Sequence, residues 1–288
     1  MKNKILPLGM GWLICFASIF ANAQEFKEHI NKEFTLQSAA GSNVFALYNI
    51  NGPIKVEGYS GDKVIIDVDK TISANTESAL QTGKQEFKVA FDQNKDSIIV
   101  YIAEPYDSRP HNHRRGEWHE KEIDYNYKLN FVVKVPTGMN ICVSTINEGT
   151  VSVKDISGTL DVHNINGAID IKNAKGTTHA STINGDLTVN YLNVPPDESS
   201  YYTLNGTLTA TYPAEFSGDL EFKSMNGEFF TDFKDVDIMP ARVVKNQKKD
   251  GETTLYKLDK NTSVRIGTGG KLFKFETLNG NIYIKKQL

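Results

Sequence analysis

Hydrophobic and polar residues alternate along the middle of the chain in blocks of nine residues, each beginning at a glycine. From Gly149 onward the blocks read GTVSVKDIS, GTLDVHNIN, GAIDIKNAK, GTTHASTIN and GDLTVNYLN. The third, fifth and eighth positions are apolar in most blocks, for example Val151, Val153 and Ile156. Because successive strand residues point to opposite faces, the third and fifth positions share one buried face. Each block therefore predicts a strand of about five residues and then a turn, whose apolar eighth position points inward.

The turns follow a second pattern, because two kinds of turn alternate along the chain. The ninth residue and the next glycine form each turn, and we expect Asn-Gly and Ser-Gly to supply positive φ angles there. One kind is Ser-Gly or Lys-Gly, as at Ser157-Gly158 and Lys175-Gly176. The other kind is Asn-Gly, at Asn51-Gly52, Asn166-Gly167, Asn184-Gly185, Asn205-Gly206, Asn226-Gly227 and Asn279-Gly280.

Alternating turns imply a unit of two strands and two corners, so we expect an all-β fold, a single-stack β-solenoid. Each coil would hold about 18–21 residues and lie about 4.8 Å from the next, with corner asparagines hydrogen-bonded in a ladder. The alternative is an antiparallel meander, since Asn-Gly is also a strong hairpin signal. A meander gives no reason for alternating corner chemistry, so the solenoid is favoured. The motif recurs from Asn51 to Asn279, which predicts one domain over residues 24–288.

Three stretches interrupt the repeat. Residues 75–87 predict one short helix, capped by Asn75, with Ala79, Leu80 and Phe87 on one side, which would cover an end or flank of the stack. Residues from about 105 to 124 form a polar insertion. Residues 236–258 predict a hairpin with a basic turn.

The N-terminus has the features of an export signal. Lys2 and Lys4 precede an uncharged apolar run over residues 5–20, and Ala21-Asn22-Ala23 fits a cleavage site. The run is short for a membrane span, which argues against an uncleaved anchor. We therefore expect residues 1–23 to be a signal peptide and the mature protein to start at Gln24. No other segment is apolar enough to span a bilayer, so we expect an exported protein in the periplasm, at the cell surface or outside the cell.

The net charge argues against nucleic-acid binding, and the cysteine count argues against an intrachain disulfide. The formal net charge is −3, and removing Lys2 and Lys4 makes it −5, which has the wrong sign for a nucleic-acid-binding protein. One of the two cysteines, Cys15, lies in the predicted signal peptide, so Cys142 has no intrachain disulfide partner. Its neighbours Ile141 and Val143 suggest a buried, inert thiol.

The repeated turn-and-strand unit, the export signal and the closing stretch from Asn279 to Lys286 resemble the bacterial putative-adhesin family of unknown function, which is built of Gly-rich β-strand repeats. The resemblance covers about residues 45–286, apart from the insertion. It implies an exported β-solenoid of the cell envelope. The family has no agreed catalytic residues, so no residue role carries over.

Two groups of residues have the types found in metal sites or in hydrolase active sites. His111 and His113, with His119 or Glu117, could ligate zinc or copper, but the polar loop around them is more simply a solvated one. The period also places Asp161 beside His179 and His163 beside Ser181 on an outward face. These residue types occur in hydrolases, yet a flat strand face offers no oxyanion hole. Four aromatic residues could stack on sugars, though packing explains them equally well: Tyr106, Trp118, Tyr201 and Tyr202.

These observations predict a non-enzymatic exported envelope protein, an adhesin-like binding or structural module without a cofactor. Its partner is unknown and would be an envelope protein or a glycan. One alternative is a polysaccharide-active enzyme on a β-helix, which needs a groove with paired carboxylates or a carboxylate and an arginine. Another is a metal-binding envelope protein that uses the loop containing His111 and His113.

The metal hypothesis can be tested directly. If the loop is only solvated, a His111→Ala, His113→Ala double variant should match the wild type in zinc and copper titrations. Wild-type micromolar binding that the double variant loses would instead support a metal site.

Overall fold

The computed structural model describes residues 24–110, 122–240, 243–250, 253–258 and 261–288. The predicted signal peptide, residues 1–23, lies outside the described residues. So do five residues of the insertion that bear on the metal and sugar hypotheses: His111, His113, Glu117, Trp118 and His119 are all in the segment 111–121.

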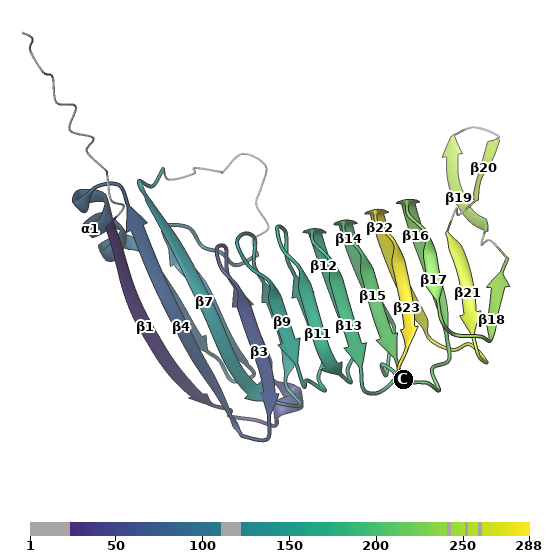
Figure 1. The fold of residues 1–288 in the computed structure, drawn as a ribbon, viewed down its shortest axis with the longest axis horizontal. Helices are drawn as coiled ribbons and strands as arrows, with labels where there is room; N and C mark the ends of the chain where they lie inside the picture. The colour runs from purple at the N-terminus through teal and green to yellow at the C-terminus, as the bar shows by residue number, and fades with distance from the viewer. Residues whose placement is uncertain (1–23, 111–121, 241–242, 251–252, 259–260) are drawn as a thin grey trace, which may run out of the picture.

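The described residues are mostly strands, which confirms the all-β prediction. Two large sheets face each other (Figure 1). Sheet A consists, in spatial order, of β1 (Gln24–Thr35), β4 (Lys63–Ala74), β7 (Tyr125–Pro136), β3 (Ile54–Tyr59), β9 (Val151–Lys154), β11 (Ile169–Ala174), β13 (Leu187–Tyr191), β15 (Leu208–Tyr212), β23 (Ile282–Lys286) and β17 (Phe229–Thr231).

Sheet B consists of β18 (Val236–Met239), β21 (Thr262–Ile266), β16 (Gly218–Asn226), β22 (Leu272–Asn279), β14 (Ser199–Asn205), β12 (Thr178–Asn184), β10 (Leu160–His163), β8 (Asn140–Ser144), β2 (Val44–Tyr48), β6 (Ser97–Glu104) and β5 (Lys88–Gln93). The predicted hairpin is present as the antiparallel pair β19 (Val243–Asp250) and β20 (Thr253–Leu258). A short 3-10 helix, η1 (Ala40–Ser42), precedes β2.

From β8 to β15 the chain alternates between the two sheets, and each strand pairs in parallel with the strand two elements later. Leu160 of β10 pairs with Thr178 of β12, and Leu187 of β13 pairs with Leu208 of β15. These registers repeat the sequence offsets of 18 and 21 residues. An antiparallel meander therefore does not form in this part of the chain.

The strands do not stack strictly in sequence order. The last two, β22 and β23, lie between β14–β15 and β16–β17, although they come last in the chain. At the other end, β2 and β3 lie between β6–β7 and β8–β9. Both displaced pairs run parallel to their neighbours, so the local strand geometry is preserved.

The core lies between the sheets and is formed by the third and fifth positions of the blocks, as the alternation predicts. Val151, Val153, Leu160 and Val162 are each at most 1% exposed. At about 25 cal/mol per Å² of apolar surface, rows of fully buried branched side chains are the main stabilising contribution.

The eighth position behaves differently at the two kinds of corner. Ile156 and Ala174, before Ser-Gly-type corners, are buried as predicted. The prediction is wrong at Leu192, which is 46% exposed, and before Asn-Gly corners, where Ile165 is 39% exposed. At the Asn-Gly corners the seventh position points inward instead, and it is polar.

These inward polar residues form a row inside the Asn-Gly corners. Thr182 Oγ1 donates to the carbonyl of Gly167, and Thr203 Oγ1 donates to that of Gly185, both at 2.8 Å. Asn164 Nδ2 donates to the Gly149 carbonyl at 2.9 Å. Each side chain thus bonds to a glycine carbonyl at the adjacent corner, which removes the cost of burying a polar group there.

The corner asparagines form a continuous chain of amide hydrogen bonds, here called the asparagine ladder. Asn166 Nδ2 donates to Asn147 Oδ1 at 2.8 Å, and Asn184 Nδ2 donates to Asn166 Oδ1 at 2.9 Å. Corner asparagines were expected to bond in this way, but Asn147, which precedes Glu148 and not glycine, was missed. In spatial order the ladder consists of Asn51, Asn147, Asn166, Asn184, Asn205, Asn279 and Asn226.

The corner glycines are needed for space, and the expectation of positive φ angles is wrong for most of them. Gly52 has a φ of 116°, but Gly167 and Gly185 have no positive φ. A Cβ on Gly185 would lie 2.3 Å from the carbonyl oxygen of Gly167, and one on Gly167 would lie 2.2 Å from that of Gly149. The backbones of adjacent corners approach so closely that no side chain fits between them.

The N-terminal end of the stack is closed by long antiparallel strands and a helix. β1 pairs with β4, and β4 with β7, and the helix α1 (Glu77–Glu86) packs against all three. Leu80 and Phe87 are buried, as predicted. The cap is Thr76 and not Asn75, because the Thr76 hydroxyl accepts from the Ala79 N–H at 3.2 Å. The charged edge strand β1 disfavours edge-to-edge aggregation.

Because a Cβ on Gly185 would clash with the Gly167 carbonyl, Gly185→Ala should destabilise the protein by about 1–3 kcal/mol, the cost of forcing the backbone to shift. Gly138→Ala is the matched control, since a Cβ there would meet only side-chain atoms at 3.9 Å or more. Urea unfolding of both variants measures the difference. Equal stability of the two variants would contradict the argument.

Candidate functional site

The outer face of sheet B carries two rows of polar residues that cross β8, β10, β12 and β14. Alternation turns every second residue of these strands away from the core, and the parallel register aligns them. One row is Cys142, Asp161, His179 and Ser200. The next is Ser144, His163, Ser181 and Tyr202.

Within this face, three side chains form a hydrogen-bonded relay. Asp161 Oδ1 lies 2.7 Å from His163 Nε2, and His163 Nδ1 lies 2.7 Å from Ser181 Oγ. His179 makes a separate contact, with its Nδ1 2.9 Å from Ser200 Oγ. The predicted neighbours, Asp161 with His179 and His163 with Ser181, are therefore confirmed by the register.

His163 stabilises the ionised form of Asp161, and both side chains are partly exposed to water. The hydrogen bond from His163 lowers the pKa of Asp161, with partial burial opposing that effect. The side chains of His163 and Asp161 are 47% and 44% exposed, so water screens the interaction. At neutral pH the carboxylate is ionised and orients the imidazole.

This arrangement can move a proton but lacks the rest of a hydrolytic site. A serine nucleophile needs donors aimed at the developing oxyanion. β10 and β12 each have hydrogen-bonded neighbours on both sides, so the sheet already uses their backbone N–H groups. The relay is therefore better described as an ordered polar surface.

Cys142 belongs to the same face, which corrects the expectation that its side chain is buried between Ile141 and Val143. It is partly buried and faces outward. Its Sγ lies 3.6 Å from Tyr48 Oη and 3.7 Å from Asp161 Oδ2. Burial raises the pKa of the Cys142 thiol, the Tyr48 hydrogen bond lowers it, and Asp161 raises it. The thiol is therefore protonated and weakly nucleophilic at neutral pH, as an inert cysteine would be.

Sequence reasoning missed Tyr48 and Ser200, although the period could have found both. Tyr48 lies three residues before the ladder residue Asn51, and Ser200 lies 21 residues after His179. Aligning these segments on their ladder asparagines would have placed both residues on this face.

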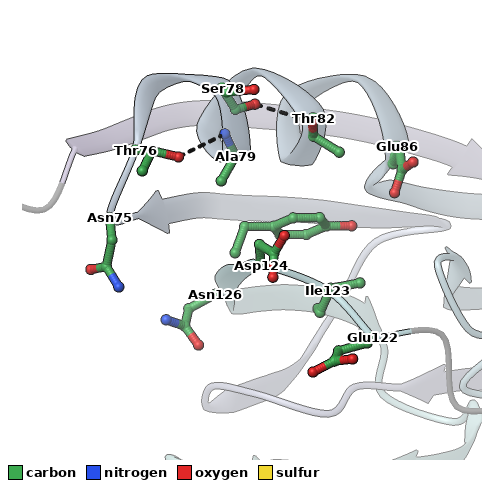
Figure 2. A pocket seen from close by; sticks show the side chains of 11 residues that line it. Asn75, Thr76, Ser78, Ala79, Thr82, Glu86, Glu122, Ile123, Asp124 and Asn126 are labelled. Carbon is green, nitrogen blue, oxygen red and sulfur yellow. Dashed lines mark hydrogen bonds between the residues drawn. The ribbon is translucent and has the colours of Figure 1, made fainter.

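A second candidate is an acidic cavity of about 600 Å³ between α1 and the start of β7. Figure 2 shows Glu86 on the helix side and Glu122 and Asp124 on the segment that leads into β7. Burial raises the pKa of the neighbouring Tyr125 phenol to about 12, with further contributions from nearby acidic groups. Most of the lining is polar, whereas sites for small organic ligands are mostly apolar.

The described residues contain no group of three or more histidine, cysteine or acidic side chains that could hold a metal ion. Two of the aromatic residues singled out for sugar stacking behave differently from each other. Tyr201 is 2% exposed, and its hydroxyl contacts those of Tyr191 and Tyr212, so it belongs to the core. Tyr202 faces outward beside Ser181. Within the part of the chain that is described, no helix is both long and apolar enough to cross a bilayer.

Comparison with known proteins gives only distant likenesses. No family model and no curated protein matches the chain. Among solved structures, it is similar to a putative cell adhesion protein from Clostridium sporogenes (8% identity, TM-score 0.40, covering 91% of this chain and 100% of that one). It is also similar to a putative adhesin from Bacteroides fragilis (11% identity, TM-score 0.36, covering 90% and 97%). A putative adhesin from Parabacteroides merdae has 9% identity and a TM-score of 0.29, covering 91% and 97%. At these TM-scores the likenesses carry no argument about function.

The contacts of Cys142 generate a prediction about its reactivity. Asp161→Asn removes the carboxylate that raises the thiol pKa, so alkylation by iodoacetamide at pH 8 should become severalfold faster. Cys142 is the only cysteine after residue 23, so the measured rate in residues 24–288 reports this thiol alone.

The control is Asp170→Asn, which removes a carboxylate from sheet A and should leave the alkylation rate unchanged. An unchanged or slower rate for Asp161→Asn would show that the carboxylate does not control the thiol.

Proposed function

We propose that this protein is a non-enzymatic, exported binding module of the bacterial cell envelope, built as a β-solenoid. The observation that supports the proposal is the series of parallel, in-register strands in the two sheets, joined at one edge by the asparagine ladder. Such a stack presents two long outer faces whose side chains repeat at the spacing of the strands.

Rigidity is what makes such faces suitable for binding. Side chains on paired strands are already ordered, so a partner need not repay their loss of conformational entropy. On sheet B, His163 is held by Asp161 and Ser181, and His179 lies against Ser200. Envelope proteins and glycans are extended partners that could contact several coils at once.

Export is supported by sequence features that agree with one another. Lys2 and Lys4 precede an uncharged apolar run, and the run ends at an Ala-Asn-Ala site that fits cleavage before Gln24. A single cysteine in the mature chain cannot mispair in an oxidising compartment. The family resemblance suggests the same location.

An enzymatic function is the second candidate, because the acidic cavity beside α1 holds three carboxylates. Paired carboxylates are the catalytic groups of most glycosidases. Turnover on a panel of soluble glycans that is lost in Glu122→Gln or Asp124→Asn would favour this candidate. Labelling of Ser181 by a fluorophosphonate would favour a hydrolase at the relay instead.

The proposal predicts both export and saturable binding. A full-length protein expressed in a Gram-negative host should appear outside the cytoplasm, with N-terminal sequencing starting at Gln24. The purified protein 24–288 should then co-sediment saturably with an isolated envelope fraction.

The export control is Ala23→Asp, which should leave the precursor uncleaved because the site requires a small residue. The binding control is the heat-unfolded protein. A cytoplasmic location or non-saturable sedimentation of the folded protein would contradict the proposal.

A further inference from the structure

An aromatic pair, of which Phe230 is exposed and Tyr283 half-buried, lies at one end of the outer face of sheet A. Phe230 of β17 is in register with Tyr283 of β23, and their ring centroids are 5.0 Å apart with planes inclined by 11°. Phe230 is 41% exposed. Its neighbour Phe229 packs on Phe222, with the two ring centroids 3.7 Å apart. In β17, Phe229 therefore packs against the core and Phe230 faces solvent.

A hollow of about 220 Å³ adjoins this pair and is lined by Phe230, Thr231, Asp232, Tyr283, Ile284 and Lys285. Lys285 Nζ lies 5.8 Å from the centre of the Tyr283 ring. The Asp232 carboxylate is fixed in place, because its Oδ1 accepts from the backbone N–H of Lys286 at 2.6 Å. Two aromatic rings thus adjoin charged groups of both signs.

Sheet A ends at β17 among the described residues, so no further strand of that sheet covers Phe230 on its outer side. Toward the middle of the sheet, Tyr283 is followed in register by Thr209 and then Thr188. The aromatic pair is therefore the end of a row of small hydroxyl side chains.

This combination suits a sugar ring. A pyranose has an apolar C–H face that packs on aromatic rings and a rim of hydroxyl groups that bond to carboxylates, ammonium groups and hydroxyls. The hollow is smaller than the roughly 300–1,000 Å³ of drug-sized sites, which suits one ring. A lipid chain would instead need a continuous apolar surface, which Asp232, Lys285 and the threonines interrupt.

We propose that this hollow binds one sugar ring of an envelope glycan by packing it against the Phe230–Tyr283 pair, in which the two rings stack on each other and Phe230 is the more exposed. Asp232 and Lys285 bond to its hydroxyls, and the glycan continues over Thr209 and Thr188. This inference rests on the proposed function, since it names the partner of the binding module.

The test uses the fluorescently labelled protein 24–288 with three probes. These are an isolated envelope fraction, the same fraction after periodate treatment, which cleaves the vicinal diols of sugars, and phosphatidylethanolamine–phosphatidylglycerol vesicles. The variant is Phe230→Ala, and the control is Val132→Ala, which removes a 44% exposed side chain at the other end of the same sheet. Circular dichroism verifies that both variants are folded.

We expect Phe230→Ala and periodate treatment each to weaken binding by about tenfold, the size of effect that a lost aromatic stack allows. Val132→Ala should bind as the wild type does, and vesicles should bind weakly. Envelope binding that survives both periodate and Phe230→Ala would overturn the sugar site and leave the binding function intact. Vesicle binding as tight as envelope binding would assign the surface to lipid. Failure of the wild type to bind any probe would instead remove the proposed function itself.

Discussion

The close approach of neighbouring backbones at the corners is the constraint on which the architecture depends. A Cβ at Gly167, Gly185 or Gly206 would lie within about 2.3 Å of the carbonyl oxygen of the glycine at the adjacent corner. Only at such distances can the inner polar row reach those carbonyls and the outer asparagines reach one another. The glycines thus set the spacing on which both hydrogen-bond rows depend.

That spacing also determines where chemistry can occur on the surface. Strands in register align every second residue into rows, so Asp161, His163 and Ser181 come together without a cavity being built around them. The same alignment brings Phe230 against Tyr283. Contacts across strands are well ordered, but the surface stays flat over most of its length.

Local patterns in the sequence were enough to predict the strands and their buried faces. Val151, Val153, Leu160 and Val162 follow the alternation that a strand imposes, and the period gave the pairing of Asp161 with His179. The inner row was visible as Asn164, Thr182 and Thr203, but the apolar residue beside each was taken as the inward one. The glycine corners were predicted for the wrong reason, because their role depends on a neighbouring coil and not on their own φ angles. The pairing of Phe230 with Tyr283 could not be predicted, since it requires the displaced placement of β22 and β23.

That displacement has a consequence for how the chain acquires its structure. The strands β22 and β23 follow β16 and β17 in the chain and yet separate them from β14 and β15. Because synthesis runs from the N-terminus, β16 and β17 cannot take their final places beside β22 and β23 until those later strands have been made. The Phe230 end of the two sheets is therefore completed by a segment that is synthesised after Phe230 itself.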